Sequence, residues 1–354
     1  MNAKAVVNMN KSVLIIYTGG TIGMINNPET GALCPFNFEQ IANEVPEIKE
    51  FGFDIDSYTL PELIDSSDVK PEVWAQLCQI ILDNYEKYCG FVVLHGTDTM
   101  AYSASALSFM LSNLTKPVVF TGSQLPIGTI RTDGRENLIA ALEIAAAYIE
   151  DKAIVPEVSI LFGAKLFRGN RTTKINAESF DAFQSFNYPP LAEIGIHIHY
   201  NYGAIDYSPR MKNVSAFTHL DTHIAILKIF PGIRPELIES VIQTPGLKGL
   251  ILETYGSGNA PTDAVFLKKI QEACKKGIII YNVTQCQGGT VEMGRYETST
   301  ALINAGVTSG YDITTEAAVC KMMYVLGQQQ DANETKKSLN SALKGEITVN
   351  RIGF

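Results

Sequence analysis

SVLIIYTGGTIGM, residues Ser12–Met24, joins a hydrophobic run to a turn that contains three glycines. The run Ser12–Tyr17 is rich in β-branched and aromatic side chains, which predicts a buried strand. The glycines let the backbone turn sharply and come close to a ligand. They place the hydroxyls of Thr18 and Thr21 at the carboxyl end of that strand, where ligands bind in open α/β sheets.

The turn after this strand has other interpretations. A phosphate-binding loop is disfavoured, because TGGTIG at residues 18–23 matches neither the GxGxxG nor the GxxxxGK[ST] pattern. An ordinary turn between a strand and a helix stays open. The more specific hypothesis is a catalytic site that uses the hydroxyls of Thr18 and Thr21.

Two further predicted strands end in polar loops. The run Phe91–Leu94 leads into His95–Met100 (HGTDTM), and a strand expected at Phe53–Leu60 leads into Glu62–Asp68 (ELIDSSD). Strands that are separated by helical crossovers and end in such loops indicate convergence on one site. Part of the second loop is also suited to cap the helix that Pro71 opens.

Strands and helices alternate along the chain, which predicts an α/β fold with two parallel sheets. At 354 residues the chain is long for one hydrophobic core, so we expect two domains. We predict a larger N-terminal domain at residues 1–200, a linker at 201–222 and a smaller C-terminal domain at 223–354. The other expected strands are Pro117–Thr121, Val158–Phe162, His223–Phe230, Gly249–Glu253 and Gly277–Val283, and the expected helices are Ala101–Leu114, Gly134–Ile149, Pro235–Ile242, Thr262–Lys276, Glu297–Asn304, Glu316–Leu326 and Asn333–Leu343.

Composition and charge exclude several classes of partner. The net charge is −9 and no basic stripe occurs, so we expect no nucleic acid. No apolar run approaches the roughly 18 residues of a spanning helix, and no signal peptide is recognisable, so we expect no membrane association and a cytoplasmic location. The sequence has neither a CxxC nor an HExxH motif, and we predict no metal and no cofactor.

A basic loop, Arg168–Lys174 (RGNRTTK), follows the strand expected at Val158–Phe162. As a surface turn it would be unremarkable. As a loop that folds over the site, it would bring Lys174 to Thr97.

Several of these segments together resemble the bacterial-type L-asparaginases, and most closely the cytoplasmic type I branch. They are TGGTIGM at 18–24, HGTDTM at 95–100, DSSD at 65–68, TTK at 172–174, GNAP at 258–261 and TQC at 284–286. The first two motifs are highly specific in this order and spacing, and the resemblance covers essentially the whole chain. It implies an asparaginase/glutaminase-like fold, hydrolysis of asparagine to aspartate and ammonia without a cofactor, and a minor activity on glutamine.

The resemblance also implies a role for individual residues. Thr21 corresponds to the primary nucleophile, Asp98 to the group that binds the substrate's α-ammonium, and Asp65–Ser67 to the segment that holds its α-carboxyl end. The implied catalytic residues are Thr21, Thr97, Asp98, Lys174 and Tyr296, and the implied substrate-binding residues are Gly20, Asp65, Ser66, Ser67, Gly96, Thr97, Asp98 and Asn259. Asn259 would reach the site from a neighbouring subunit of a homodimer or of a homotetramer built as a dimer of dimers.

Elementary chemistry makes these roles plausible. A threonine hydroxyl is a weak nucleophile until a base takes its proton, and an acyl-enzyme divides one difficult hydrolysis into two easier steps. Lysine can act as that base if burial lowers its pKa towards neutrality. Thr97, Lys174 and Asp98 then form a triad of hydroxyl, base and orienting group. Which threonine attacks first stays open.

The sequence departs from the family pattern at two points. Many relatives have a tyrosine in the first loop, whereas Gly31–Pro35 contains none, so Tyr296 is the expected substitute; a packed surface tyrosine is the alternative. Some type I enzymes bind activating asparagine through an arginine in the strand before the Tyr-Gly-x-Gly-Asn loop. Here Glu253 stands at that point and would repel the effector's carboxylate, which disfavours such activation.

Two other functions remain as alternatives. One is the glutaminase-like subunit of a tRNA-dependent amidotransferase, which shares the motifs; the acidic balance and the lack of an N-terminal extension disfavour it. The other is an amino-acid-binding module without catalysis. It is disfavoured because both threonines, the aspartate and the lysine are present.

Overall fold

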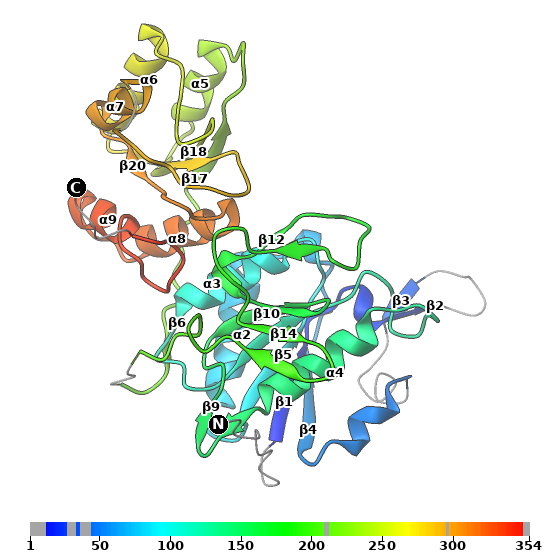
Figure 1. The fold of residues 1–354 in the computed structure, drawn as a ribbon. Coiled ribbons are helices and arrows are strands. Elements are labelled where there is room, and N and C mark those ends of the chain that lie inside the picture. The colour runs from blue at the N-terminus through cyan, green and yellow to red at the C-terminus, as the bar shows by residue number, and fades with distance from the viewer. Residues whose placement is uncertain (1–11, 27–32, 36–43, 209–211, 295–296, 350–354) are drawn as a thin grey trace. The chain divides into compact units, whose positions relative to one another are not determined.

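The computed structural model describes residues 12–26, 33–35, 44–208, 212–294 and 297–349 (Figure 1). The chain divides into two compact units, the first reaching Thr218 and the second beginning at His219. This division lies within the segment 201–222 that we predicted as a linker. The exact domain bounds stay a prediction.

The first unit is built on a mixed sheet whose strands run in the order β15-β14-β11-β10-β7-β5-β1-β4. The strands from β10 to β4 are parallel to their neighbours, and β11, β14 and β15 add antiparallel pairs at one edge. The bounds are β1 Ser12–Tyr17, β4 Asp54–Thr59, β5 Gly90–Leu94, β7 Val118–Thr121, β10 Val158–Phe162, β11 Lys165–Arg168, β14 Ala192–Ile194 and β15 Ile198–Tyr200.

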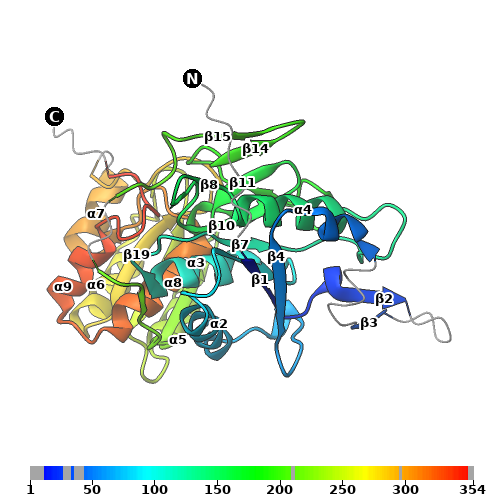
Figure 2. The same cartoon turned by 90° about the horizontal axis from the view of Figure 1, so that it is seen from below.

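Among the described residues of the first unit, helices α2, α3 and α4 cover this sheet. Alternate residues of β1, such as Val13 and Ile15, pack in one hydrophobic cluster with Leu138 and Leu142 of α4, because successive side chains of a strand point to opposite faces. Figure 2 shows α4 on one face of the sheet and α2 and α3 on the other. The helices are α2 Pro71–Asp83, α3 Met100–Met110 and α4 Gly134–Ala145, and the short strands are β2 Met24–Asn26, β3 Leu33–Pro35, β6 Leu111–Ser112, β8 Tyr148–Ile149, β9 Lys152–Ala153, β12 Thr173–Lys174, β13 Phe183–Gln184 and β16 Ser215–Ala216.

The second unit has a smaller parallel sheet, in the order β17-β18-β19-β20. Leu250, Leu252 and Ile280 of its central strands are fully buried and belong to a cluster with Phe266 and Ile270 of α6. The elements are β17 Ile224–Lys228, α5 Pro235–Ile242, β18 Gly249–Thr254, α6 Ala264–Lys275, β19 Ile279–Thr284, α7 Glu297–Ala305, β20 Thr308–Ser309, α8 Thr315–Gly327 and α9 Ala332–Leu339.

The predicted fold class, two α/β units with the larger one first, is confirmed. The predicted helix Ala101–Leu114 is too long, because Leu111 leaves the helix and pairs with Ala216 in the β6–β16 ladder. Similarly, the helix predicted to reach Ile149 ends at Ala145, because the next residues form the β8–β9 hairpin.

Candidate active site

Four neighbouring strands of the first unit end at the same edge of the sheet. β4, β1, β5 and β7 are adjacent and parallel, so the loops that follow them lie side by side. These loops contain the residues around Asp65, Thr21, Thr97 and Gln124. The convergence predicted from the glycine- and hydroxyl-rich loops therefore occurs in the fold.

The loops touch through glycines. Gly20 has a φ of +88°, and a Cβ built on it would lie 2.5 Å from the Cα of Gly96. A Cβ built on Gly96 would in turn lie 2.6 Å from Ser66 Oγ. These approaches leave no room for a side chain at either glycine. Because Thr21 follows Gly20 and Thr97 follows Gly96, the two threonines lie on loops in contact.

Gly96→Ala should lower the free energy of unfolding by about 1–3 kcal/mol, because the added methyl group overlaps the Ser66 side chain. Thermal and urea unfolding measure the change. Gly52→Ala is the matched control, since nothing lies within 4 Å of the Cβ position of Gly52. Equal stability of the two variants would contradict the close packing of these loops.

Lys174 joins the basic loop to the loop after β5. Its Nζ lies 2.7 Å from Thr97 Oγ1 and 2.8 Å from Asp98 Oδ1. The lysine side chain is 17% exposed, whereas that of Asp98 is 65% exposed. An ammonium group donates to the threonine oxygen, and a neutral amine can accept the threonine proton, so the contact serves both protonation states of Lys174.

Hydrogen bonds and an ion pair of neighbouring residues hold the segment that carries Lys174 in place. Arg168 is buried and forms an ion pair with Glu157, with Nε 2.6 Å from Oε2. Thr172 Oγ1 donates to the carbonyl of Arg168 at 2.7 Å, and Lys174 pairs with Phe183 in the β12–β13 ladder. These contacts fix the backbone of Lys174, so only its side-chain torsions remain to be set.

Asp65 and Ser67 form a compact turn after β4. Asp65 Oδ1 accepts from the backbone N–H of Ser67 at 2.9 Å and from its hydroxyl at 2.8 Å, and these bonds lower the pKa of Asp65. Our expectation that this segment caps the following helix is wrong: α2 begins at Pro71 after Lys70, without a side-chain cap. Asp65 instead caps the 3-10 turn Ser66–Asp68.

Two contacts at the site were not anticipated from the sequence. Thr99 Oγ1 donates to the carbonyl of Ser66 at 2.6 Å and ties two loops together. Gln124 Oε1 accepts from Thr97 Oγ1 at 3.4 Å, and its amide nitrogen donates to Ser179 O at 3.0 Å. The available signal for Gln124 was its position in the loop after β7, at the shared edge of the sheet.

Two predicted site residues do not belong to the loops of the first unit that the structure describes. Asn259 is in the second unit, where it forms a β-bridge with Tyr255. Tyr296 lies outside the described residues. Glu253, also in the second unit, accepts from Thr315 Oγ1 at 2.7 Å, and Lys228 Nζ is 3.5 Å from its other oxygen.

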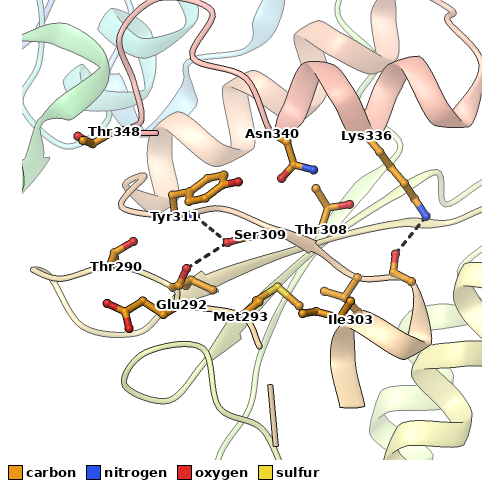
Figure 3. Close-up of a pocket in the computed structure, with 13 residues that line it drawn as sticks. Thr290, Glu292, Met293, Ile303, Thr308, Ser309, Tyr311, Lys336, Asn340 and Thr348 are labelled. Atoms are coloured by element: carbon orange, nitrogen blue, oxygen red, sulfur yellow. Dashed lines mark hydrogen bonds between the residues drawn. The ribbon is translucent and has the colours of Figure 1, made fainter. Parts of the chain in front are cut away.

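The second unit has a pocket of about 840 Å³ between the 290–293 segment, β20 and α9 (Figure 3). Thr308, Ser309 and Asn340 contribute polar groups, and Lys336 Nζ donates to the carbonyl of Gly306 at 3.1 Å. Its described lining includes none of the predicted site residues. Within the described ranges no cluster of three or more His, Cys, Asp or Glu side chains is suited to a metal, and no helix could span a membrane.

Lys174 thus meets Thr97 and Asp98, which lie in the loop after the parallel strand β5. Known protein families match both units of this chain. The family "Asparaginase, N-terminal" matches residues 12–206, and the family "Glutaminase/Asparaginase C-terminal domain" matches residues 223–339. L-asparaginase 1 of Escherichia coli (strain K12) is 44% identical over 96% of this chain and 98% of its own length. The chain belongs to the asparaginase family of amide hydrolases, as the motifs predicted.

Two further relatives extend the comparison. The crystal structure of L-asparaginase I from Vibrio cholerae has a TM-score of 0.87 and 40% identity, and the match covers 96% of this chain and 100% of that one. A glutamyl-tRNA(Gln) amidotransferase subunit of Pyrococcus abyssi is 35% identical, over 95% of this chain and 76% of that protein. Both match nearly the whole of this chain.

Proposed function

We propose that this protein hydrolyses the side-chain amide of L-asparagine to L-aspartate and ammonia, with a minor activity on L-glutamine. The observation that carries the proposal is the contact of Lys174 Nζ with both Thr97 Oγ1 and Asp98 Oδ1. The near full-length similarity to proteins named L-asparaginase supports the choice of substrate. One methylene of substrate length is worth only about 1–3 kcal/mol in a pocket, so some glutamine turnover is expected.

In the proposed mechanism Thr21 Oγ attacks the amide carbon, and Lys174 acts through Thr97. The neutral amine of Lys174 takes the proton of the attacking hydroxyl by way of the Thr97 hydroxyl. The proton then goes to the leaving nitrogen, and ammonia departs from an acyl-enzyme. Water attacks the ester with the same base, and aspartate is released. Backbone N–H groups of the glycine-rich loops stabilise the oxyanion in both steps.

The proposed substrate pocket binds both ends of a small zwitterion. Asp98 Oδ1 is held by Lys174, which leaves Oδ2 to accept from the α-ammonium. The turn Asp65–Ser67 holds the α-carboxyl end, and the bonds from Asp65 to Ser67 fix its shape. Gly20 and Gly96 line the pocket, and the absence of side chains lets the loops that carry them pack closely there.

We further propose a homodimer or homotetramer in the cytoplasm, in which Asn259 borders the site of a neighbouring subunit, and that Tyr296 takes the role of the tyrosine missing from the first loop. This assembly and location rest on the resemblance of the motifs to the type I branch. Glu253 already binds Thr315 and lies beside Lys228, and its negative charge disfavours an activating site for asparagine at that point. Velocity should therefore depend hyperbolically on asparagine concentration.

A second candidate is the amide-hydrolysing subunit of a tRNA-dependent amidotransferase, which the similarity to the Pyrococcus abyssi protein favours. One assay distinguishes the two: ammonia release from L-asparagine, L-glutamine and D-asparagine, with and without a tRNA partner. We expect L-asparagine to be hydrolysed fastest and without any partner. Release from glutamine that requires the partner, together with inert asparagine, would overturn the asparaginase proposal.

A further inference from the structure

His95 is a buried imidazole next to the loop that carries Thr97, and the proposed mechanism does not use it. It directly follows β5 and is 1% exposed. Burial lowers the pKa of His95 to about 4, so the ring is neutral at physiological pH. A neutral imidazole has one N–H donor and one acceptor nitrogen, and its neighbours determine which nitrogen is which.

The hydrogen bonds around His95 settle these roles. Its Nδ1 lies 2.7 Å from the carbonyl oxygen of Gly96, which can only accept, so Nδ1 carries the proton. Its Nε2 therefore accepts from Ser103 Oγ, which lies 2.9 Å away. The indole Nε1 of Trp74 is a donor only and bonds to the same Ser103 oxygen at 2.9 Å. All three bonds run in one direction, from Trp74 to Gly96.

The hydrogen-bonded chain connects three elements of the first unit. Trp74 lies on α2 and is 5% exposed, and Ser103 lies on α3 and is fully buried. Hydrogen bonds aligned in this way polarise one another, and in a low-dielectric interior each is stronger than in water. Residues of α2 and α3 thus fix the orientation of the imidazole, and its Nδ1–H points at the carbonyl of Gly96.

The carbonyl that receives this N–H belongs to the peptide that joins Gly96 to Thr97. A peptide unit is planar, so fixing the Gly96 carbonyl also fixes the N–H and Cα of Thr97. The close contacts of Gly96 with Gly20 and Ser66 limit its position, and His95 sets its orientation. Thr97 is the residue whose hydroxyl contacts Lys174 at 2.7 Å.

We propose that Trp74, Ser103 and His95 are positioning residues that fix the Gly96–Thr97 peptide and thereby aim the Thr97 hydroxyl at Lys174. The inference rests on the proposed function, because the direction of this hydroxyl matters only if Thr97 takes part in amide hydrolysis. None of the three touches the substrate. Their effect should appear in kcat more than in KM.

Two amide variants of His95 separate the two nitrogens. In His95→Asn the amide nitrogen stands near the former Nδ1 and can still donate to Gly96. In His95→Gln the amide stands near the former Nε2 and can reach only Ser103. We expect His95→Gln to lower kcat by about tenfold, the worth of one lost hydrogen bond, and His95→Asn to keep kcat within about threefold. KM for asparagine should change by less than about threefold in both variants.

A merely structural role predicts a different pattern. With a merely structural role, kcat would fall in step with the melting temperature. With the positioning role, the two variants should have similar melting temperatures, because both lose the imidazole, and different kcat values. Equal loss of kcat in the two variants, or kcat that simply follows the melting temperature, would overturn the proposal. Ser103→Ala is a milder variant should His95→Gln fail to fold, and it should lower kcat by about two- to fivefold. The exposed His199 gives the controls His199→Asn and His199→Gln.

The direction of the chain can be measured without any turnover. The ¹⁵N shifts of His95 in the wild-type protein should show Nδ1 protonated and Nε2 as an acceptor at neutral pH. The chain has five histidines, so the signal of His95 is assigned by its loss in His95→Asn. A proton on Nε2 would overturn the inference. Failure of the wild-type protein to release ammonia would instead refute the proposed function, and the ¹⁵N result would still test the hydrogen-bonded chain.

Discussion

Lys174→Met is expected to lower kcat for asparagine hydrolysis by about 10²–10⁴-fold, the usual worth of a general base. Methionine keeps the unbranched stem and removes the nitrogen that lies 2.7 Å from Thr97 Oγ1. The fold should persist, because the backbone of Lys174 is held by the β12–β13 ladder. Steady-state ammonia release, followed between about pH 5 and 9, measures the effect.

Two further measurements make the role of Lys174 specific. Lys165→Met, at an exposed position of the same unit, is the control and should behave as the wild type. In Lys174→Ala, added small primary amines should restore part of the activity, because they can occupy the space of the missing ammonium group. A kcat of Lys174→Met within about threefold of wild type, with the same pH profile, would rule out Lys174 as the base.

Thr21→Ala should reduce ammonia release by roughly 10³-fold or more, since removal of a nucleophile abolishes the covalent route. Thr21→Ser keeps the hydroxyl and is the matched control; it should retain measurable turnover. Thr21 begins a 3-10 turn whose N-cap is Gly20, and no side-chain cap bond holds this turn, so both replacements should leave its backbone unchanged. Circular dichroism and thermal unfolding should therefore match the wild type.

Trapping the acyl-enzyme decides which threonine attacks. After acid quenching during turnover, peptide mass spectrometry should find the aspartyl ester on Thr21 in the wild type and in Thr97→Ala, where hydrolysis of the ester is slowed. The ester should be absent from Thr21→Ala. An ester on Thr97 in the Thr21→Ala variant would reverse the proposed order.

The sequence predicted the framework of the site well, for a local reason. The β-branched run Ser12–Tyr17 and the glycines after it specify strand and turn within one short segment, and β1 has the predicted bounds. The basic loop Arg168–Lys174 was predicted to bring Lys174 to Thr97 if it folded over the site. The structure places Lys174 Nζ 2.7 Å from Thr97 Oγ1.

What the sequence did not predict depends on contacts between distant segments. Gln124 meets Thr97 only because β7 pairs with β5. The role of His95 depends on Ser103 and Trp74, which come from two separate helices. Neither Ser103 nor Trp74 stands in a local sequence pattern that points to His95.

The antiparallel edge of the first sheet was also missed, although a local signal existed. β10 and β11 form a hairpin in which Phe162 pairs with Lys165, so only Gly163 and Ala164 form the turn. Gly163 has a φ of +58°, the left-handed conformation that tight hairpin turns require. A glycine between two apolar runs indicates such a hairpin, and we had predicted parallel sheets instead.

The contact of Gly20 with Gly96, and of Gly96 with Ser66, affects how this enzyme can be engineered. Substitutions in loops that share partners are not additive, so the best residue in one loop depends on the residues in the other two. Screening each loop separately for a new amide substrate would discard combinations that work only together. Libraries that vary the three loops at once are the appropriate starting point for redesign.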